Sequence, residues 1–101
     1  MSALNQFLAQ RLQSDHSVPQ EDPESPPWWE DGQTVEIDQQ TYYRYLDMLP
    51  PRYMDGDLFA FAEGAGNFVL FWRESTRYFA HPLSDADTAE FSALTRVPLH
   101  Q

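Results

Sequence analysis

Cysteine and lysine are both absent from the 101-residue sequence. Without cysteine, disulfides, zinc–thiolate sites and thiol nucleophiles are excluded, and a cross-linked extracellular domain is disfavoured. Without lysine, the six basic side chains are all arginines, dispersed among sixteen acids. We therefore expect a cytoplasmic protein that forms its core without covalent cross-links.

Long hydrophobic runs are also missing. The longest apolar run, residues 68–72, is far shorter than the roughly 20 residues that a membrane-spanning helix needs. Residues 1–12 lack the basic start and the apolar centre of a signal peptide. Anionic lipids would require a basic cluster, which the sequence does not contain. We expect no membrane association.

The distribution of charge is the most informative feature that is present. Between Leu12 and Tyr43 the chain has eight carboxylates and no arginine. Residues 1–43 carry a net charge of −7, and residues 44–101 carry −3 of the total of −10. Such a one-sided stretch is either left in solvent or kept for a cationic partner. Direct binding to nucleic acid is disfavoured, because phosphate contacts need clusters of basic side chains.

The first 27 residues are predicted to form a short helix followed by an acidic, proline-rich linker. Apolar residues recur at helical spacing in residues 3–13, and Ser2 is placed to cap that helix. Residues 14–27 contain four prolines and only one apolar residue, Val18. This composition buries too little surface to offset chain entropy. We expect residues 1–27 to be partly flexible.

Residues 28–101 are predicted to form a small α+β domain, in which helices pack on a curved antiparallel sheet of three or four strands. Asp38 is placed to cap a helix that ends at Pro50-Pro51, and Ser84 begins a capping-box pattern. The predicted order is β-α-β-β-β-α, with strands at residues 34–37, 58–62, 68–73 and 78–81 and helices at 39–49 and about 85–95.

The predicted strand at residues 68–73 needs cover on both faces. Phe68, Leu70 and Trp72 point to one face, and Val69 and Phe71 point to the other. The two predicted helices of the domain shield one face. The other face requires the Trp28-Trp29 pair, the N-terminal helix folding back, or a second protein molecule.

No catalytic, metal or cofactor motif is found, and we expect a protein that is not an enzyme and holds no cofactor. His81 is the histidine best placed for proton transfer. It can pair with Asp85 or Asp87, although a solvent-facing strand end explains it equally well. An alternative hypothesis places a pocket for an anionic compound around Arg73, Arg77 and His81, in a small-molecule-binding domain or a minor enzyme.

Two segments carry residue types that are enriched at protein interfaces. One is the Trp28-Trp29 pair, where the carboxylates guide a partner and an indole supplies buried area. The other is the proline-stiffened stretch 49–54, in which Tyr53 either faces a partner or fills the core. The predicted partner-binding residues are Glu21, Asp22, Glu24, Trp28, Trp29, Glu30, Asp31, Arg52 and Tyr53.

Several short motifs between Trp28 and Leu99 carry a family resemblance. They are Trp28-Trp29, Tyr42 with residues 49–54, Phe59-Ala60-Phe61-Ala62-Glu63-Gly64, Leu70-Phe71-Trp72-Arg73, Tyr78-Phe79 and Arg96-Val97-Pro98. By these motifs the chain resembles short, uncharacterised bacterial proteins associated with plasmids, integrative elements and prophages. The resemblance implies a small accessory protein without known catalysis and transfers no functional residue. The N-terminal helix and the acidic linker lie outside it.

Taken together, these features favour a non-enzymatic interaction module that docks on a basic surface of a partner, such as a nucleic-acid-binding protein. One version is an anti-defence protein of a mobile element that occupies a site meant for nucleic acid. A third hypothesis, beside the small-molecule pocket, is a homodimer with a regulatory or structural role.

Overall fold

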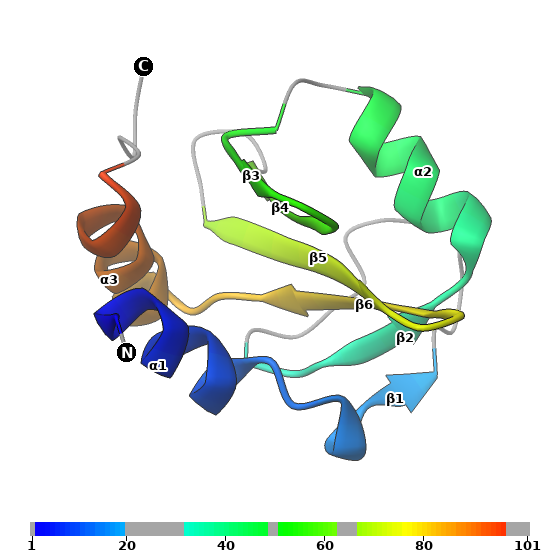
Figure 1. Cartoon of the computed structure of the whole chain (residues 1–101), viewed down its shortest axis with the longest axis horizontal. Helices are drawn as coiled ribbons and strands as arrows, with labels where there is room; N and C mark the ends of the chain where they lie inside the picture. Colours follow the sequence, from blue (N-terminus) through cyan, green and yellow to red (C-terminus); the bar gives the residue numbers. More distant parts are fainter. Residues whose placement is uncertain (1, 20–31, 49–50, 63–66, 97–101) are drawn as a thin grey trace.

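The computed structural model describes residues 2–19, 32–48, 51–62 and 67–96. These residues form a six-stranded sheet with helix α2 on one face and helices α1 and α3 on the other (Figure 1). The helices are α1 (Ala3–Arg11), α2 (Gln39–Met48) and α3 (Asp85–Thr95), and a 3₁₀ turn spans Ser14–His16. The strands are β1 (Val18–Pro19), β2 (Val35–Ile37), β3 (Tyr53–Asp55), β4 (Leu58–Ala62), β5 (Phe68–Glu74) and β6 (Arg77–Pro82).

The strand order is β1-β2-β6-β5-β4-β3. All neighbouring strands are antiparallel except β1 and β2, which are parallel. The predicted α+β class and the antiparallel meander of β4, β5 and β6 are confirmed. The turn between β3 and β4 uses Gly56 at a φ of 63°, a conformation that glycine adopts without the steric cost of a Cβ.

Three polar side chains begin the three helices, as the sequence predicts. The Ser2 hydroxyl accepts the N–H of Asn5 at 3.1 Å, and the Asp38 carboxylate accepts the N–H of Thr41 at 2.7 Å. The Ser84 hydroxyl likewise accepts the N–H of Asp87. Each bond satisfies a backbone donor that lacks a partner in the first turn of a helix. These local signals explain why the helix starts could be located from the sequence.

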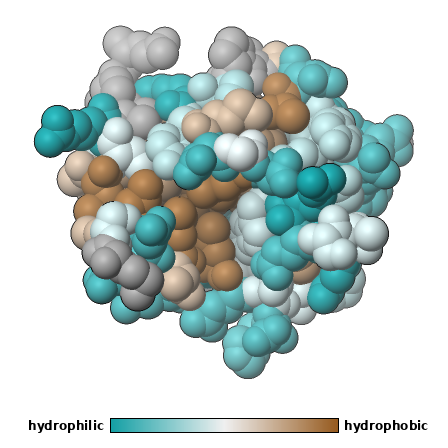
Figure 2. Space-filling model, viewed as in Figure 1, coloured by the Kyte–Doolittle hydropathy of each residue, from teal (hydrophilic) through white to brown (hydrophobic). Residues whose placement is uncertain are grey.

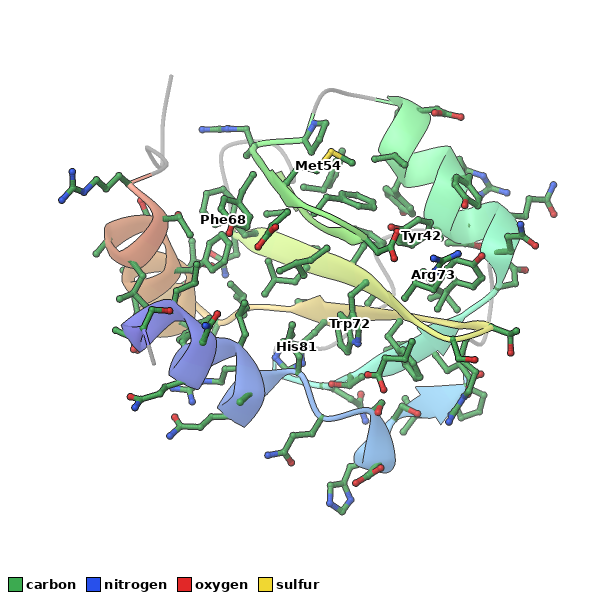
Figure 3. The ribbon with its side chains drawn as sticks, viewed as in Figure 1. Tyr42, Met54, Phe68, Trp72, Arg73 and His81 are labelled. Carbon is green, nitrogen blue, oxygen red and sulfur yellow. The ribbon has the colours of Figure 1, made fainter. Side chains whose placement is uncertain are left out.

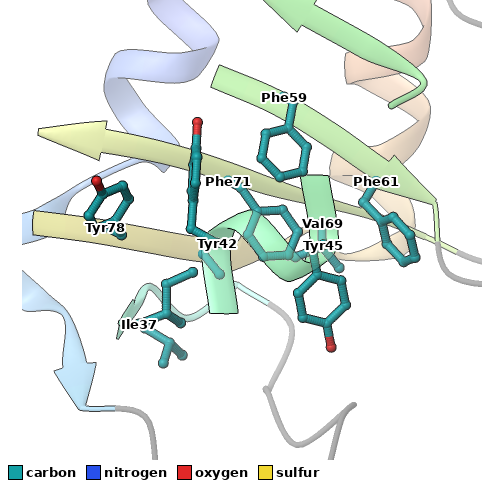
Figure 4. Close-up of a cluster of buried hydrophobic side chains, with 10 residues drawn as sticks. Ile37, Tyr42, Tyr45, Phe59, Phe61, Val69, Phe71 and Tyr78 are labelled. Carbon is teal, nitrogen blue, oxygen red and sulfur yellow. The ribbon is translucent and has the colours of Figure 1, made fainter. Parts of the chain in front are cut away.

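Aromatic rings form the core between α2 and the sheet (Figure 4). The rings of Phe59 and Phe71 stack across β4 and β5 with centroids 4.8 Å apart, and Tyr45 of α2 stacks on Phe71 at 5.0 Å. Tyr42, one turn earlier in α2, packs edge-on against Phe59. Each ring of this size contributes roughly 1.5–3 kcal/mol when it is fully buried.

The opposite face of the sheet is covered by α1 and α3. Phe7 of α1 is 2% exposed, and its ring centroid lies 6.0 Å from that of Phe91 of α3. The Phe91 ring in turn packs against Phe68 of β5. The N-terminal helix therefore folds back onto the domain, which is one of the three covers that the sequence left open. The expectation that both domain helices shield the same face is wrong, because α2 and α3 pack on opposite faces. Figure 2 shows hydrophobic side chains gathered on the part of the surface that carries these two helices.

Residues 14–19 differ from the prediction, which assigned them to a linker. The Ser14 hydroxyl donates to the Glu74 carboxylate, whose other oxygen accepts the indole N–H of Trp72. Val18 and Pro19 then form β1 at the edge of the sheet. The linker prediction is thus wrong for these six residues, because their polar composition is offset by hydrogen bonds to β5 and backbone pairing to β2.

The sheet also has more strands than predicted. Strand β3 pairs Tyr53 with Ala60 and Asp55 with Leu58, although the sequence suggested a loop there. With β1, this raises the count in the described residues from the expected three or four to six. The boundary expected between residues 27 and 28 lies outside the described residues. The helix α1 and strand β1 that precede it pack with the rest of the fold.

Candidate functional site

In the folded part of the chain, Arg11, Arg73 and Arg77 are each paired with a carboxylate. Arg77 reaches both carboxylate oxygens of Glu36, at 2.8 and 3.2 Å. Arg73 lies 3.1 Å from Asp57, and Arg11 lies 3.1 Å from Asp87. The hydrogen bond from Arg77 lowers the pKa of Glu36 below its usual 4.5. In each of these pairs the positive charge of an arginine is neutralised by a carboxylate of the same fold.

We call residues 20–31 the acidic stretch. The residues on either side of it, Pro19 and Gly32, are described by the structure. Before it, Pro19 pairs with Glu36 in the register of β1 and β2. After it, the N–H of Gly32 donates to the carbonyl of Pro82 at 2.7 Å. The stretch is therefore tethered at both ends to the folded part of the chain. Of the predicted partner-binding residues, those that lie outside the described residues are Glu21, Asp22, Glu24, Trp28, Trp29, Glu30 and Asp31.

Arg52 and Tyr53 lie at the outer edge of the sheet, where β4 meets β3. The Arg52 guanidinium stands 5.9 Å from the ring centroid of Phe68. The Tyr53 ring is half-buried and meets Phe91 edge-on at 5.5 Å. Tyr53 thus packs on the core with part of its surface exposed, between the two roles that the sequence allowed. Met54 beside it is 54% exposed.

Arg73 belongs to a polar cluster on the α2 side of the sheet (Figure 3). It pairs with Asp57 and hydrogen-bonds Tyr78, which faces it across β5 and β6. The Tyr42 hydroxyl donates to the backbone carbonyl of Asp57. Burial, with a smaller contribution from the Asp57 charge, raises the pKa of Tyr42 to about 12. This cluster ties α2 to the β3–β4 turn.

Arg77, the first residue of β6, lines a cavity of about 500 Å³. Glu36, Tyr78 and the first residues of α2 also line it. The guanidinium lies 5.0 Å from the ring centroid of Phe79 while it pairs with Glu36. Arg77 therefore mainly links β6 to β2 through its ion pair with Glu36.

His81 is buried, with 3% of its surface exposed. Its Nδ1 lies 2.9 Å from the Thr34 hydroxyl, and its Nε2 has no hydrogen-bond partner among the described residues. Burial lowers the pKa of His81 below 6.5, an effect that nearby Asp87 opposes and Arg11 reinforces. The neutral imidazole is thus the favoured form, and neither carboxylate expected from the sequence hydrogen-bonds to it.

A second cavity, of about 420 Å³, includes His81 in its lining. We call it the His81 cavity; its lining includes Gln10, Arg11, Gln13, Thr34, His81 and Asp87.

The predicted anion pocket of Arg73, Arg77 and His81 is not formed: neither of the two cavities described above is lined by all three residues. Side chains alternate along a strand, so Arg73 lies on the α2 side while Arg77 and His81 face the opposite side. Arg77 lines the cavity near α2, and His81 lines the other. The sequence predicted that the three residues lie close together because their strands are neighbours. Arg73 and Arg77, however, lie on opposite faces of the sheet, and Arg77 and His81 lie towards opposite ends of β6.

Sequence reasoning missed Thr34 and Arg11 as neighbours of His81, although it named Asp87 as one. Thr34 meets His81 through the pairing of β2 with β6, across 47 residues. Arg11 meets Asp87 only because α1 folds back onto α3. The single usable signal was Ser84, whose capping of α3 fixes where Asp87 lies.

No group of three or more histidine, cysteine, aspartate or glutamate side chains in the described residues is arranged to hold a metal ion. Among the same residues, no helix combines the length and apolar character that crossing a bilayer requires.

Comparisons with known proteins give no match: no family model matches the chain, and neither curated proteins nor solved structures yield a significant similarity.

Proposed function

We propose that this protein is a non-enzymatic interaction module that docks through its acidic stretch, residues 20–31, on a basic surface of a partner protein. The partner class that suits this chemistry best is a nucleic-acid-binding protein, whose surface already accommodates phosphate charge. The sequence resemblance implies an accessory protein of a mobile element, and an anti-defence role is one version of this proposal.

The observation that carries this proposal is the unequal use of charge. In the folded part, Arg11, Arg73 and Arg77 are each paired with a carboxylate. The acidic stretch contains five acids and no basic residue. Negative potential that is not compensated locally accelerates encounters with a cationic surface and selects against other partners. Pro19 and Gly32, the described residues that border the stretch, are both attached to the sheet, by strand pairing and by a hydrogen bond to Pro82.

The other two hypotheses receive less support. Both faces of the sheet are covered by the chain's own helices, so no second copy is needed to shield the apolar face. An anion pocket formed by Arg73, Arg77 and His81 is disfavoured, because the three side chains lie in different places.

The test is capture of partners from cells of the source organism at two salt concentrations. Wild-type protein is compared with a neutralised variant carrying Glu21→Gln, Asp22→Asn, Glu24→Gln, Glu30→Gln and Asp31→Asn. Screening shortens the Debye length from about 10 Å at about 0.1 M salt to about 3 Å at about 1 M salt. We expect a basic protein to be retained only by the wild type and only at low salt, and a short DNA duplex to displace it.

A matched control removes the same amount of charge from elsewhere. The exposed acids Asp15, Asp47, Asp55, Asp85 and Glu90 are replaced by their amides, which leaves residues 20–31 intact. Retention by this control and loss in the neutralised variant assigns docking to the acidic stretch. Equal retention by both variants, or no retained protein at low salt, would contradict the proposal.

A further inference from the structure

The His81 cavity is a second candidate site, separate from the acidic stretch. Its volume of about 420 Å³ lies within the range of about 300–1,000 Å³ that is usual for small-ligand pockets. It is bounded by the end of α1, the start of β2 and the end of β6. In Figure 3 the His81 side chain lies between β6 and the chain that follows α1.

The first binding group in this cavity is the His81 ring. Because the Thr34 hydroxyl stands 2.9 Å from Nδ1, it can donate its proton there, which leaves the ring proton on Nε2. Nε2 is buried and has no partner among the described residues. A buried donor without an acceptor is unfavourable, so a ligand oxygen that accepts this N–H gains more than it would at an exposed site.

The second binding group is the ion pair of Arg11 and Asp87. Arg11 uses Nε on Asp87 Oδ2, at 3.1 Å, and Nη1 on Gln10, at 3.2 Å. Its Nη2 lies 4.0 Å from a carboxylate oxygen of Glu90. A guanidinium has five N–H donors, so N–H groups beyond those bonded to Asp87 and Gln10 remain for a ligand. The carboxylate of Asp87 accepts the Arg11 hydrogen bond through Oδ2, and an ionised carboxylate has further acceptor positions. The lining of the His81 cavity therefore presents the N–H donors of the Arg11 cation beside the acceptor oxygens of the Asp87 anion.

The balance of charge selects the class of ligand. A simple anion is repelled by Asp87, by nearby Glu90 and by the net charge of −10, and a simple cation leaves the N–H donors of Arg11 and His81 without an acceptor. A molecule with both charges meets neither penalty. We propose that the His81 cavity binds a small zwitterion of the α-amino acid class. Its carboxylate accepts hydrogen bonds from Arg11 and from His81 Nε2, and its ammonium donates to Asp87.

The test follows the His81 ring by NMR in full-length protein labelled with ¹⁵N-histidine. Three probes are titrated: L-alanine, propionate, which lacks the ammonium, and ethylammonium, which lacks the carboxylate. We expect L-alanine to shift the Nε2 signal with a Kd of about 1 mM, the affinity range of a small ligand with few contacts. Each of the other two probes should bind at least about tenfold more weakly.

Two variants identify the site. Asp87→Asn should weaken L-alanine about tenfold while propionate binds as well as before or better, because the ammonium loses its partner while Arg11, released from its ion pair, still binds the carboxylate. Asp57→Asn removes the acid of an ion pair on the other side of the sheet and should leave every probe unchanged. If no probe moves the His81 signals of the wild type, the site is refuted. Equal affinities for propionate and L-alanine would overturn the zwitterion assignment.

Discussion

Arg11 and Asp87 join α1 to α3 through an ion pair of 3.1 Å between residues 76 positions apart. Their side chains are 31% and 19% exposed, so the pair is shielded from solvent more than the Arg73–Asp57 pair, at 42% and 57%. The same guanidinium lies 5.1 Å from the ring centroid of Phe7. The ion pair and the apolar contact of α1 therefore form one attachment.

We predict that Asp87→Asn lowers the free energy of unfolding by about 1 kcal/mol, the upper range for ion pairs that are not fully buried. Asp57→Asn is the matched control, and its loss should be clearly smaller because its pair is more exposed to solvent. Urea unfolding of both variants at low salt measures the difference. Equal losses in the two variants would show that burial of the Arg11–Asp87 pair adds nothing.

Phe7→Ala tests the attachment of α1 from its apolar side. Phe7 is 2% exposed and shares a cluster with Leu70, Leu83 and Phe91. Removing a fully buried phenylalanine costs about 3–5 kcal/mol through lost burial and the cavity left behind. We expect a loss of this size in urea unfolding, together with faster proteolysis near the N-terminus. Gln6→Ala, on the exposed side of the same helix, is the control; a loss below about 1 kcal/mol for Phe7→Ala would mean that α1 is only loosely docked.

Much of the fold could be predicted because its signals are local. The cap at Ser84 and the spacing of Phe91 and Leu94 define α3 within a few residues. The meander follows from the continuous apolar run of β5 and the short connections to its neighbours, so pairing such as Phe71 with Ala80 needs no distant information. Residue periodicity and turn chemistry are sufficient for such elements.

The cavity and the two outer strands could not be predicted, because long-range packing determines them. Strand β1 is only two residues long and becomes ordered by pairing with β2. His81 was expected at a solvent-facing end, yet α1 covers that side of the sheet and the residue is 3% exposed. No local pattern in residues 3–13 indicates what that helix will cover. The partner of Nδ1, Thr34, becomes known only once β2 is aligned with β6.

Tyr42→Phe tests the polar cluster beneath α2. The hydroxyl of Tyr42 donates to the backbone carbonyl of Asp57, and its loss should cost about 1 kcal/mol, as for a typical partly buried hydrogen bond. Tyr43→Phe is the control, since Tyr43 is 40% exposed. Urea unfolding near neutral pH measures both. A Tyr42→Phe variant as stable as the wild type would show that water replaces this bond without cost.

The same residue predicts an alkaline dependence. The pKa of Tyr42 is about 12 in the folded state against an ordinary value of 10.0. The native state therefore retains a proton that the unfolded chain releases, and stability falls as pH rises from about 10 towards 12. Tyr42→Phe should reduce this decline relative to the wild type. Ultraviolet titration of the folded protein should show one tyrosine that ionises near pH 12 in the wild type and is missing from the variant.

His81 predicts a loss of stability on mild acidification. Its pKa is lowered below 6.5 by burial, so the unfolded chain takes up a proton at a pH where the native imidazole stays neutral. Unfolding is then favoured as pH falls below 6.5, and the loss levels off below the native pKa. Asp87 raises the pKa of His81 and Arg11 lowers it. The Thr34 hydroxyl lies within hydrogen-bond distance of Nδ1. His16, which lines the same cavity, is the other histidine present there.

His81→Gln should flatten the fall in urea-unfolding free energy between about pH 7.5 and about pH 5.5, whatever the variant's stability at the upper end. His16→Gln should leave the fall intact, because His16 is exposed. Glu36, whose pKa is held below 4.5 by Arg77, loses its contribution only at lower pH and does not obscure the comparison. If His81→Gln and the wild type decline in parallel, the native imidazole accepts a proton as readily as the unfolded one, and its burial does not control the charge of this cavity.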